Sequence, residues 1–279
     1  MSSGISPQES GRWSAIDFDP RTYAIAQKPT RSQPFFASLT AKTVLFDVPY
    51  CDIGKAPDVW GLVNWGAHDP GVTEQSRPHQ LREEISKRFG PYPALEYIYG
   101  FLWPSPEKTR LAAEALVKAV EVRGDIAHWM LTERFPDWKL GFVVVSECHS
   151  AIEPMWHGVD RNHPLHDIAS APLAREGLRR LYTAIDRFIG KLIGSFPEAT
   201  VFLFAMHGMG SNRGDVPSMC LLAELLYRHA FGRPYMREIT CGHLCIPHSG
   251  RSVRSHIFAL GVTLVRPGSF TSAEKESPP

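Results

Sequence analysis

The sequence predicts an α/β fold built on a parallel sheet with helices on both faces. Two continuous apolar runs, Leu140–Val145 and Thr200–Ala205, have the composition of strands that are covered on both faces. A long amphipathic segment at 173–196 connects them, and strand, long helix and strand in this order form a βαβ unit. The right-handed crossover rule then predicts that the two strands are parallel neighbours.

The elements before this unit also have recognisable local signals. The β-branched, apolar run at 43–50 fits a buried strand that ends at Pro49. The next apolar face repeats with helical spacing at Leu81, Ile85 and Phe89, and Gly90 ends that helix. A longer helix is predicted to run to about Arg134, because Ser105 suits an N-cap and Pro106 the first helical position.

These elements divide the chain into four consecutive regions. They are an irregular N-terminal segment (1–38), a cap-like region with a strand, a Trp- and Gly-rich loop and helices (39–136), an α/β core with the candidate metal site (137–235), and an irregular tail (236–279). We find no internal repeat.

The composition and the distribution of apolar residues argue against several classes of protein. The 279 residues carry 30 Lys and Arg against 29 Asp and Glu, so the net charge of +1 gives no reason to expect a nucleic-acid polymer or an anionic membrane as partner. The polar start MSSGISPQES is not a secretory signal, and no run approaches the ~18 apolar residues of a membrane helix. The 5 scattered cysteines argue against a disulfide scaffold. We therefore expect a cytoplasmic protein with reduced thiols.

Ligand-type side chains follow both strands of the predicted βαβ unit. Ligands of parallel α/β sheets bind beyond the carboxyl ends of the strands, where this chain has Glu147, His149, Glu153 and His157 after the first strand and His207 after the second. His149 and Glu153 are four residues apart, which places them on one face of a helix. Imidazole and carboxylate at this density suit zinc or manganese. The alternative is a polar loop whose histidines cap turns and bond the backbone.

Three further groups have both a functional and a structural interpretation. His207 could be a core histidine bonded to a carbonyl, and Met206 is more simply a core side chain than a metal ligand. The segment CGHLCIPH has four zinc-competent side chains in a non-standard spacing, so coincidence is favoured over a structural zinc site; they are Cys241, His243, Cys245 and His248. A last set could line a cleft or serve in turns: Asp47, Asp52, His68 and Asp69.

The order of these motifs resembles that of a known family. The strings VVVSECHSAIEPMWHGVDRNHP, RRLYTAIDRFIGKLI and VFLFAMHGMG are similar to successive motifs of the type I phosphodiesterase/nucleotide pyrophosphatase family of the alkaline phosphatase superfamily. The segments DVPY and WGAHDP resemble the part that precedes the first metal motif. The resemblance covers roughly residues 17–235 and implies an alkaline-phosphatase-like core that is incomplete at its N-terminal side.

The resemblance implies two-metal hydrolysis, in which one ion activates a Ser or Thr nucleophile and both ions hold the transferring group. The first family motif has Asp and His where this chain has His149 and Glu153, and the second has Asp and His where it has Met206 and His207. The family's nucleophile lies in a segment with no counterpart here, so no nucleophile is identified. We therefore expect this chain to correspond to the middle and later part of such an enzyme.

We therefore expect a metal-dependent phosphoester hydrolase of the phosphodiesterase/pyrophosphatase type, acting on a small phosphoester or related anion. Zinc is the first choice of cofactor and manganese the second, as one or two ions on His149, Glu153 and His207. Glu147 and His157 are expected to orient these ligands or to replace one of them. The alternative is a non-catalytic remnant or fragment of the family that acts as a binding or scaffold protein. Its expected partners are a complementing N-terminal segment or a second copy of the chain.

Overall fold

The computed structural model describes most of the chain in two compact units. The first unit spans Met1–Met206 and Ile257–Pro279, and the second spans His207–His256. The described residues are 4–11, 16–22, 24–27, 34–68, 71–100, 103–205, 208–209, 215–235, 256–257 and 260–268. Among them, no helix combines the length and the apolar character that a membrane crossing requires.

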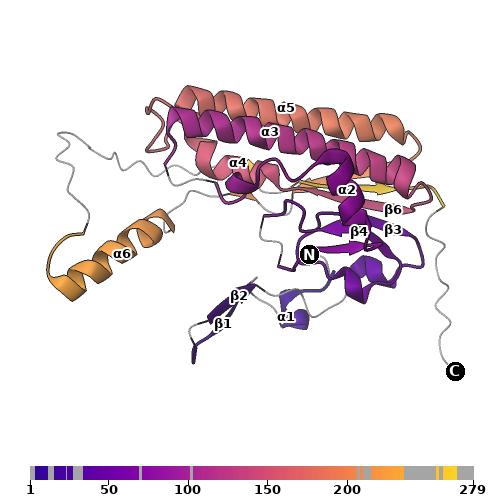
Figure 1. The fold of residues 1–279 in the computed structure, drawn as a ribbon, viewed down its shortest axis with the longest axis horizontal. Helices are drawn as coiled ribbons and strands as arrows, with labels where there is room; N and C mark the ends of the chain where they lie inside the picture. The colour runs from indigo at the N-terminus through magenta and orange to yellow at the C-terminus, as the bar shows by residue number, and fades with distance from the viewer. Residues whose placement is uncertain are drawn as a thin grey trace. The chain divides into compact units, whose positions relative to one another are not determined.

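The first unit is built on a mixed, six-stranded open sheet (Figure 1). Its strand order is β5-β4-β3-β6-β10-β7. The central strand β3 is parallel to both β4 and β6, whereas β5 and β10 are antiparallel to their neighbours. The α/β class is thus confirmed, with a parallel centre and antiparallel flanks. The strands are β3 (Thr43–Phe46), β4 (Val59–Val63), β5 (Gln75–Arg77), β6 (Leu140–Val145), β7 (Thr200–Ala205) and β10 (Leu260–Val265).

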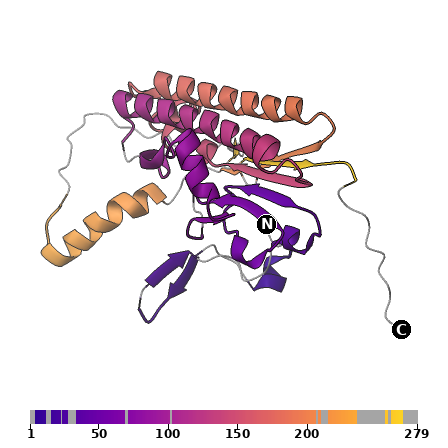
Figure 2. The ribbon, with the colours of Figure 1, turned by 45° about the vertical axis from the view of Figure 1, so that its right-hand side comes forward.

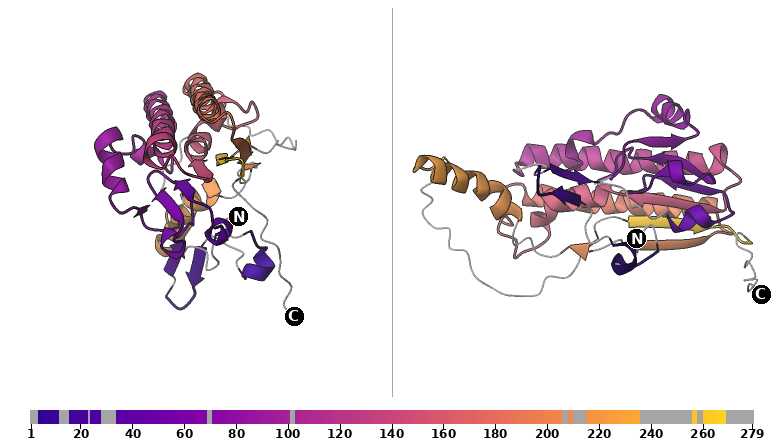
Figure 3. Two further views of the ribbon diagram at one scale, coloured as in Figure 1. Left: turned by 90° about the vertical axis from the view of Figure 1, so that its right-hand side faces the viewer. Right: turned by 90° about the horizontal axis from the view of Figure 1, so that it is seen from below.

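Helices cover one face of this sheet. The long helices α3 and α5 run side by side above it, with the short α4 between them and the strands (Figures 1 and 3). Ser105 caps α3 as expected, because its side chain accepts the N–H of Lys108 at 3.3 Å. The local signals in the sequence therefore located α2 (Leu81–Phe89), α3 (Pro106–Trp129) and α5 (Ala171–Ser195). The helix α4 (Glu147–Met155) was not predicted as an element, and α3 continues as a π-helical segment over Met130–Arg134.

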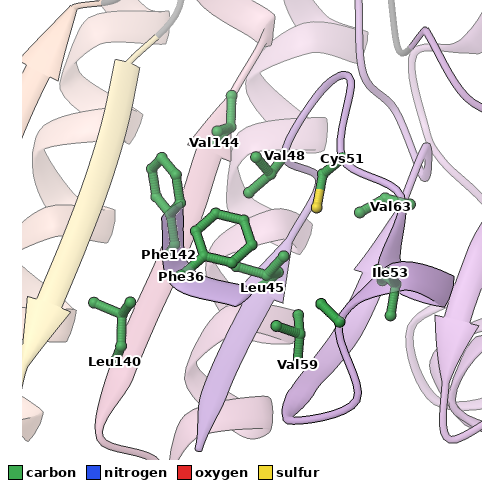
Figure 4. Packing of buried hydrophobic residues seen from close by; sticks show 11 residues of the cluster. Phe36, Leu45, Val48, Cys51, Ile53, Val59, Val63, Leu140, Phe142 and Val144 are labelled. Atoms are coloured by element: carbon green, nitrogen blue, oxygen red, sulfur yellow. The ribbon is translucent and has the colours of Figure 1, made fainter. Parts of the chain in front are cut away.

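The other face of the sheet carries an apolar cluster instead of long helices. Leu140, Phe142 and Val144 project from alternate positions of β6 into this cluster, as the strand period requires (Figure 4). Phe36, from the 3₁₀ helix η1 (Phe35–Ser38), packs against Phe142 with ring centroids 6.3 Å apart. The sequence predicted helices on both faces of the sheet. Within the described residues, one face carries the long helices, whereas the other carries short 3₁₀ helices, including η2 (Ile53–Lys55).

The predicted βαβ unit is partly wrong. Strands β6 and β7 are parallel to each other, but β10 lies between them and is antiparallel to both, with Val262 opposite Val143 on one side and Leu203 on the other. The interpretation of 236–279 as an irregular tail missed this strand. The expectation of a covered β7 is also wrong: in this edge strand Phe202 is 55% and Leu203 48% exposed.

Smaller elements complete the described residues. In the N-terminal segment, α1 (Pro7–Ser10) begins with a capping box formed by Ser6 and Glu9, and β1 (Ile16–Asp19) pairs with β2 (Ala24–Gln27) (Figure 2). The 3₁₀ helices η3 (Leu95–Tyr97) and η5 (Trp156–Gly158) lie in loops of the first unit. The remaining elements are β8 (Gly208–Met209), which pairs with β9 (His256–Ile257), and α6 (Asp215–Phe231) in the second unit.

Candidate metal centre

The candidate site lies where three parallel strands end. Because β4, β3 and β6 are neighbours and run in the same direction, their carboxyl ends meet at one edge of the sheet. Asp47 directly follows β3, and the loop after β4 carries His68. After β6 the chain turns straight into α4, which carries Glu147, His149 and Glu153. The fold therefore brings together side chains from three strand ends.

Two histidines and one carboxylate form the core of the site. One ligand atom from each of His68, His149 and Glu153 lies within 4.8 Å of the other two. The Nε2 atom of His149 is 3.1 Å from Oε1 of Glu153, and Nε2 of His68 is 3.8 Å from Oε2 of the same carboxylate. The two imidazole rings are stacked, with centroids 3.7 Å apart and an interplanar angle of 18°. Both histidines therefore contact the same carboxylate, each at a different oxygen.

Helix geometry and aromatic packing hold this group in place. His149 and Glu153 are one turn apart on α4, as their spacing predicted. Tyr99 packs edge-on against the His68 ring at 4.7 Å. The side chains are 7% exposed for His68, 15% for His149 and 38% for Glu153, so the group opens to solvent at its carboxylate.

Glu153 is ionised at neutral pH. Burial by itself would raise the pKa of this carboxyl, but hydrogen bonds and charge from His149 and His68 lower it to about 2. An ionised carboxylate beside imidazole nitrogens is the form that binds a divalent cation.

The group could hold a metal ion, and the spacing expected for zinc serves as a reference. With zinc–ligand bonds of about 2.0–2.1 Å in a tetrahedron, ligand atoms lie about 3.3 Å apart. The 3.1 Å between His149 Nε2 and Glu153 Oε1 is close to this spacing, whereas the 3.8 Å from His68 Nε2 runs to the other carboxylate oxygen, Oε2. Two histidines and one carboxylate leave the fourth position of a tetrahedral ion open, as in catalytic zinc sites, whereas structural zinc sites use four protein ligands.

A buried charge cluster lies behind the candidate ligands. Arg123 of α3 donates to Glu147 at 2.8 Å and 2.9 Å and to Asp47 at 2.8 Å, and all three side chains are fully buried. The guanidinium also lies 5.3 Å from the ring centroid of Phe46 and 5.2 Å from that of Trp65. Burial alone would lower the pKa of Arg123, but the carboxylates of Glu147 and Asp47 raise it above its ordinary value. The cluster is thus a guanidinium held between two carboxylates and two aromatic rings.

Glu147 and His157 do not join the ligand group. Glu147 is bonded to Arg123, and the buried His157 places Nε2 at 3.0 Å from Ser170 Oγ. Burial, and then the nearby His163, lower the pKa of His157. The remaining histidines of this loop bond the backbone: Nδ1 of His166 is 2.8 Å from the His157 carbonyl, and Nδ1 of His163 accepts the N–H of Leu165 at 3.1 Å. The polar-loop alternative thus describes these three histidines.

The structure also places His68, which the sequence indicated only as a cleft-lining residue. Its neighbour Asp69 lies outside the described residues, as do His207, Met206 and the four zinc-competent side chains of CGHLCIPH. Asp52 serves in a turn, which was one of its two interpretations, since its carboxylate accepts the N–H of Gly54 at 3.1 Å. The position of His68 was not predicted, because the sequence did not indicate the strand β4 that precedes its loop. The β4 run VWGLV is apolar but short.

Comparison with known proteins adds no relative. The chain matches no family model, no curated protein and no solved structure.

Proposed function

We propose that this chain binds one divalent cation, zinc in the first place and manganese in the second, through His68, His149 and Glu153. The observation that carries the proposal is the convergence of two imidazoles and one ionised carboxylate within 4.8 Å. Imidazole nitrogen with carboxylate oxygen is a common ligand set of zinc, and His–His–Glu is one of its catalytic forms.

The proposed reaction is hydrolysis of a small phosphoester. A zinc ion held by His68, His149 and Glu153 would supply a Lewis acid for a phosphoryl oxygen and would lower the pKa of a water molecule, so that no Ser or Thr would be required as nucleophile. The chain's own contribution is to hold two ligands on α4 and one on the loop after β4, and to leave the side of Glu153 open to solvent. The resemblance of the motifs around His149 to those of type I phosphodiesterases supports this choice of substrate class.

Hydrolysis of bis(p-nitrophenyl) phosphate tests the proposed reaction. The metal-stripped chain should be inactive and should gain activity with one equivalent of zinc or manganese, and His149→Ala should remain inactive with either metal. Ser195→Ala, at the half-buried last residue of α5, removes a hydroxyl that donates to the Lys191 carbonyl and serves as the control that keeps full activity. Zinc binding without any hydrolysis of phosphodiesters or monoesters would contradict the reaction while leaving the metal site standing.

A second candidate function is a non-catalytic binding role, and the edge strand β7 favours it. The strand TVFLFA has no charge and no proline, and Phe202 and Leu203 are exposed on its opposite faces. Natural edge strands usually carry charge or proline that prevents pairing with another chain. Self-association through this strand should make the sedimentation coefficient depend on concentration in the native chain but not in Phe202→Lys. A concentration-independent monomer would contradict this role.

A further inference from the structure

The two candidate histidines come from separate parts of the fold. His149 lies in the first half of α4, and His68 lies in the loop after β4. A metal ion requires both imidazoles at a fixed separation, so some part of the protein must set the distance between helix and loop. The inference below therefore rests on the proposed metal site.

Asp47 fixes the loop. Its two carboxylate oxygens accept the backbone N–H groups of Trp65 at 2.9 Å and of Gly66 at 3.0 Å, just before His68 in the chain. The Asp47 backbone has a φ of 60°, in the left-handed region, which turns the chain out of β3. A strained, fully buried residue that binds two consecutive amides of a loop is typical of a positioning device.

Ser146 and Glu147 fix the helix to the same loop. The Ser146 hydroxyl donates to the carbonyl of Gly66 at 2.8 Å, so the residue before α4 is bonded directly to the loop that carries His68. Glu147, the first residue of α4, is held by Arg123, which also holds Asp47. One guanidinium thus joins the carboxylate that binds the loop and the carboxylate that begins the helix.

Aromatic packing leaves the loop little freedom. Trp65 lies against Arg123 on one side, and its ring packs edge-on against Tyr92 at 5.0 Å. Gly66 is required at its position, because a Cβ there would lie 2.4 Å from the Tyr92 ring. The backbone that leads to His68 is therefore held by hydrogen bonds and by close packing.

A buried ion cluster of this kind is a poor device for stability alone. Removing charges from water costs about as much free energy as their attraction returns, and apolar side chains of similar volume often do as well. Here two carboxylates share one guanidinium, and the hydrogen bonds of Asp47 and Ser146 go to the loop that carries a candidate ligand. Orientation of the loop that carries His68 accounts for the positions of Asp47 and Ser146.

From these contacts we infer that Asp47, Ser146, Glu147 and Arg123 form a positioning cluster that sets His68 against His149 for metal binding. The members of this positioning cluster do not touch the ion. They act through the backbone of Trp65 and Gly66 and through the start of α4.

The test compares zinc affinities of variants that remain folded. Asp47→Asn keeps the size of the side chain but replaces one acceptor oxygen by an N–H₂ group that cannot accept from a backbone amide. Ser146→Ala removes only the hydroxyl that donates to Gly66. Ser170→Ala is the matched control, because it removes a buried hydroxyl bonded to His157, which is not one of the candidate ligands. Zinc affinity is measured by chelator competition at a temperature where circular dichroism shows each variant to be fully folded.

We expect zinc affinity to fall about 10- to 100-fold in Asp47→Asn and several-fold in Ser146→Ala, and to be unchanged in Ser170→Ala. The visible spectrum of the Co²⁺-loaded chain should change in the first two variants only, since it reports ligand geometry rather than stability. If Asp47→Asn fails to fold, Ser146→Ala decides the question.

Two other results have different meanings. Native affinity and a native Co²⁺ spectrum in the folded Ser146→Ala and Asp47→Asn variants would overturn the positioning role and leave the metal site intact. A wild-type chain that binds neither zinc nor cobalt would overturn the metal site and, with it, the positioning role.

Discussion

Strands β6 and β7 have nearly the same composition but opposite surroundings. Both are six-residue apolar runs, yet every residue of β6 is buried, whereas β7 is exposed or half-buried throughout. β6 lies between β3 and β10. The helices cover one of its faces, and the apolar cluster covers the other. β7 has β10 on one edge, and no described strand pairs with its other edge.

The comparison shows that an apolar run predicts a strand but not what covers it. The candidate metal ligands and the positioning cluster gather around the end of β6 and its parallel neighbours, where packing holds them. The site thus belongs to the well-covered half of the sheet.

Arg123→Met should lower the free energy of unfolding by about 3–5 kcal/mol, because it leaves two buried carboxylates without their counter-charge. Lys191→Met is the matched control: its ion pair with Asp125, at 2.8 Å, is exposed and should contribute about 0–1 kcal/mol. Urea unfolding followed by circular dichroism measures both. Equal losses in the two variants would mean that the cluster beside β6 contributes no more than a surface pair.

Phe142→Ala and Phe202→Ala make the same change in the two strands. Phe142 is 7% exposed, and its truncation should lower the free energy of unfolding by about 3–5 kcal/mol. Phe202 is 55% exposed, and its truncation should cost less than about 1 kcal/mol. A loss at Phe202 as large as that at Phe142 would show that β7 is covered in solution, by a second copy or by another part of the chain.

Acidification should destabilise the chain through two histidines that follow α4, the buried His157 and the half-buried His163. Burial lowers the pKa of both His157 and His163 in the folded state, so the unfolded chain binds more protons. Their contribution is therefore present above the ordinary histidine pKa of about 6.5 and is lost as the pH falls below it. The unfolding midpoint should drop between pH 7 and pH 5.

The histidine origin of this effect can be checked by substitution. His157→Gln should reduce the drop in midpoint, whereas His229→Gln, at an exposed position of α6, should leave it unchanged. An undiminished drop in His157→Gln would assign the pH dependence to other groups.

Local signals explain what the sequence predicted. Caps and helical spacing located α2, α3 and α5, and the four-residue spacing placed His149 and Glu153 on one helical turn. Strand neighbours depend on pairing between distant segments, so the sequence did not predict that β10 separates β6 from β7. The same holds for His68: its approach to His149 requires β4 beside β3, and the short run VWGLV in a Trp- and Gly-rich region did not indicate a strand.

The central claim is that His68 completes a metal site with His149 and Glu153, and zinc content after exhaustive dialysis tests it most directly. The wild-type chain should retain about one zinc, with at least a 100-fold loss of affinity in His68→Ala, His149→Ala and Glu153→Gln. His157→Gln, which changes a histidine bonded to Ser170, should keep its zinc. A wild-type chain free of zinc, or a His68→Ala variant with native affinity, would contradict the account.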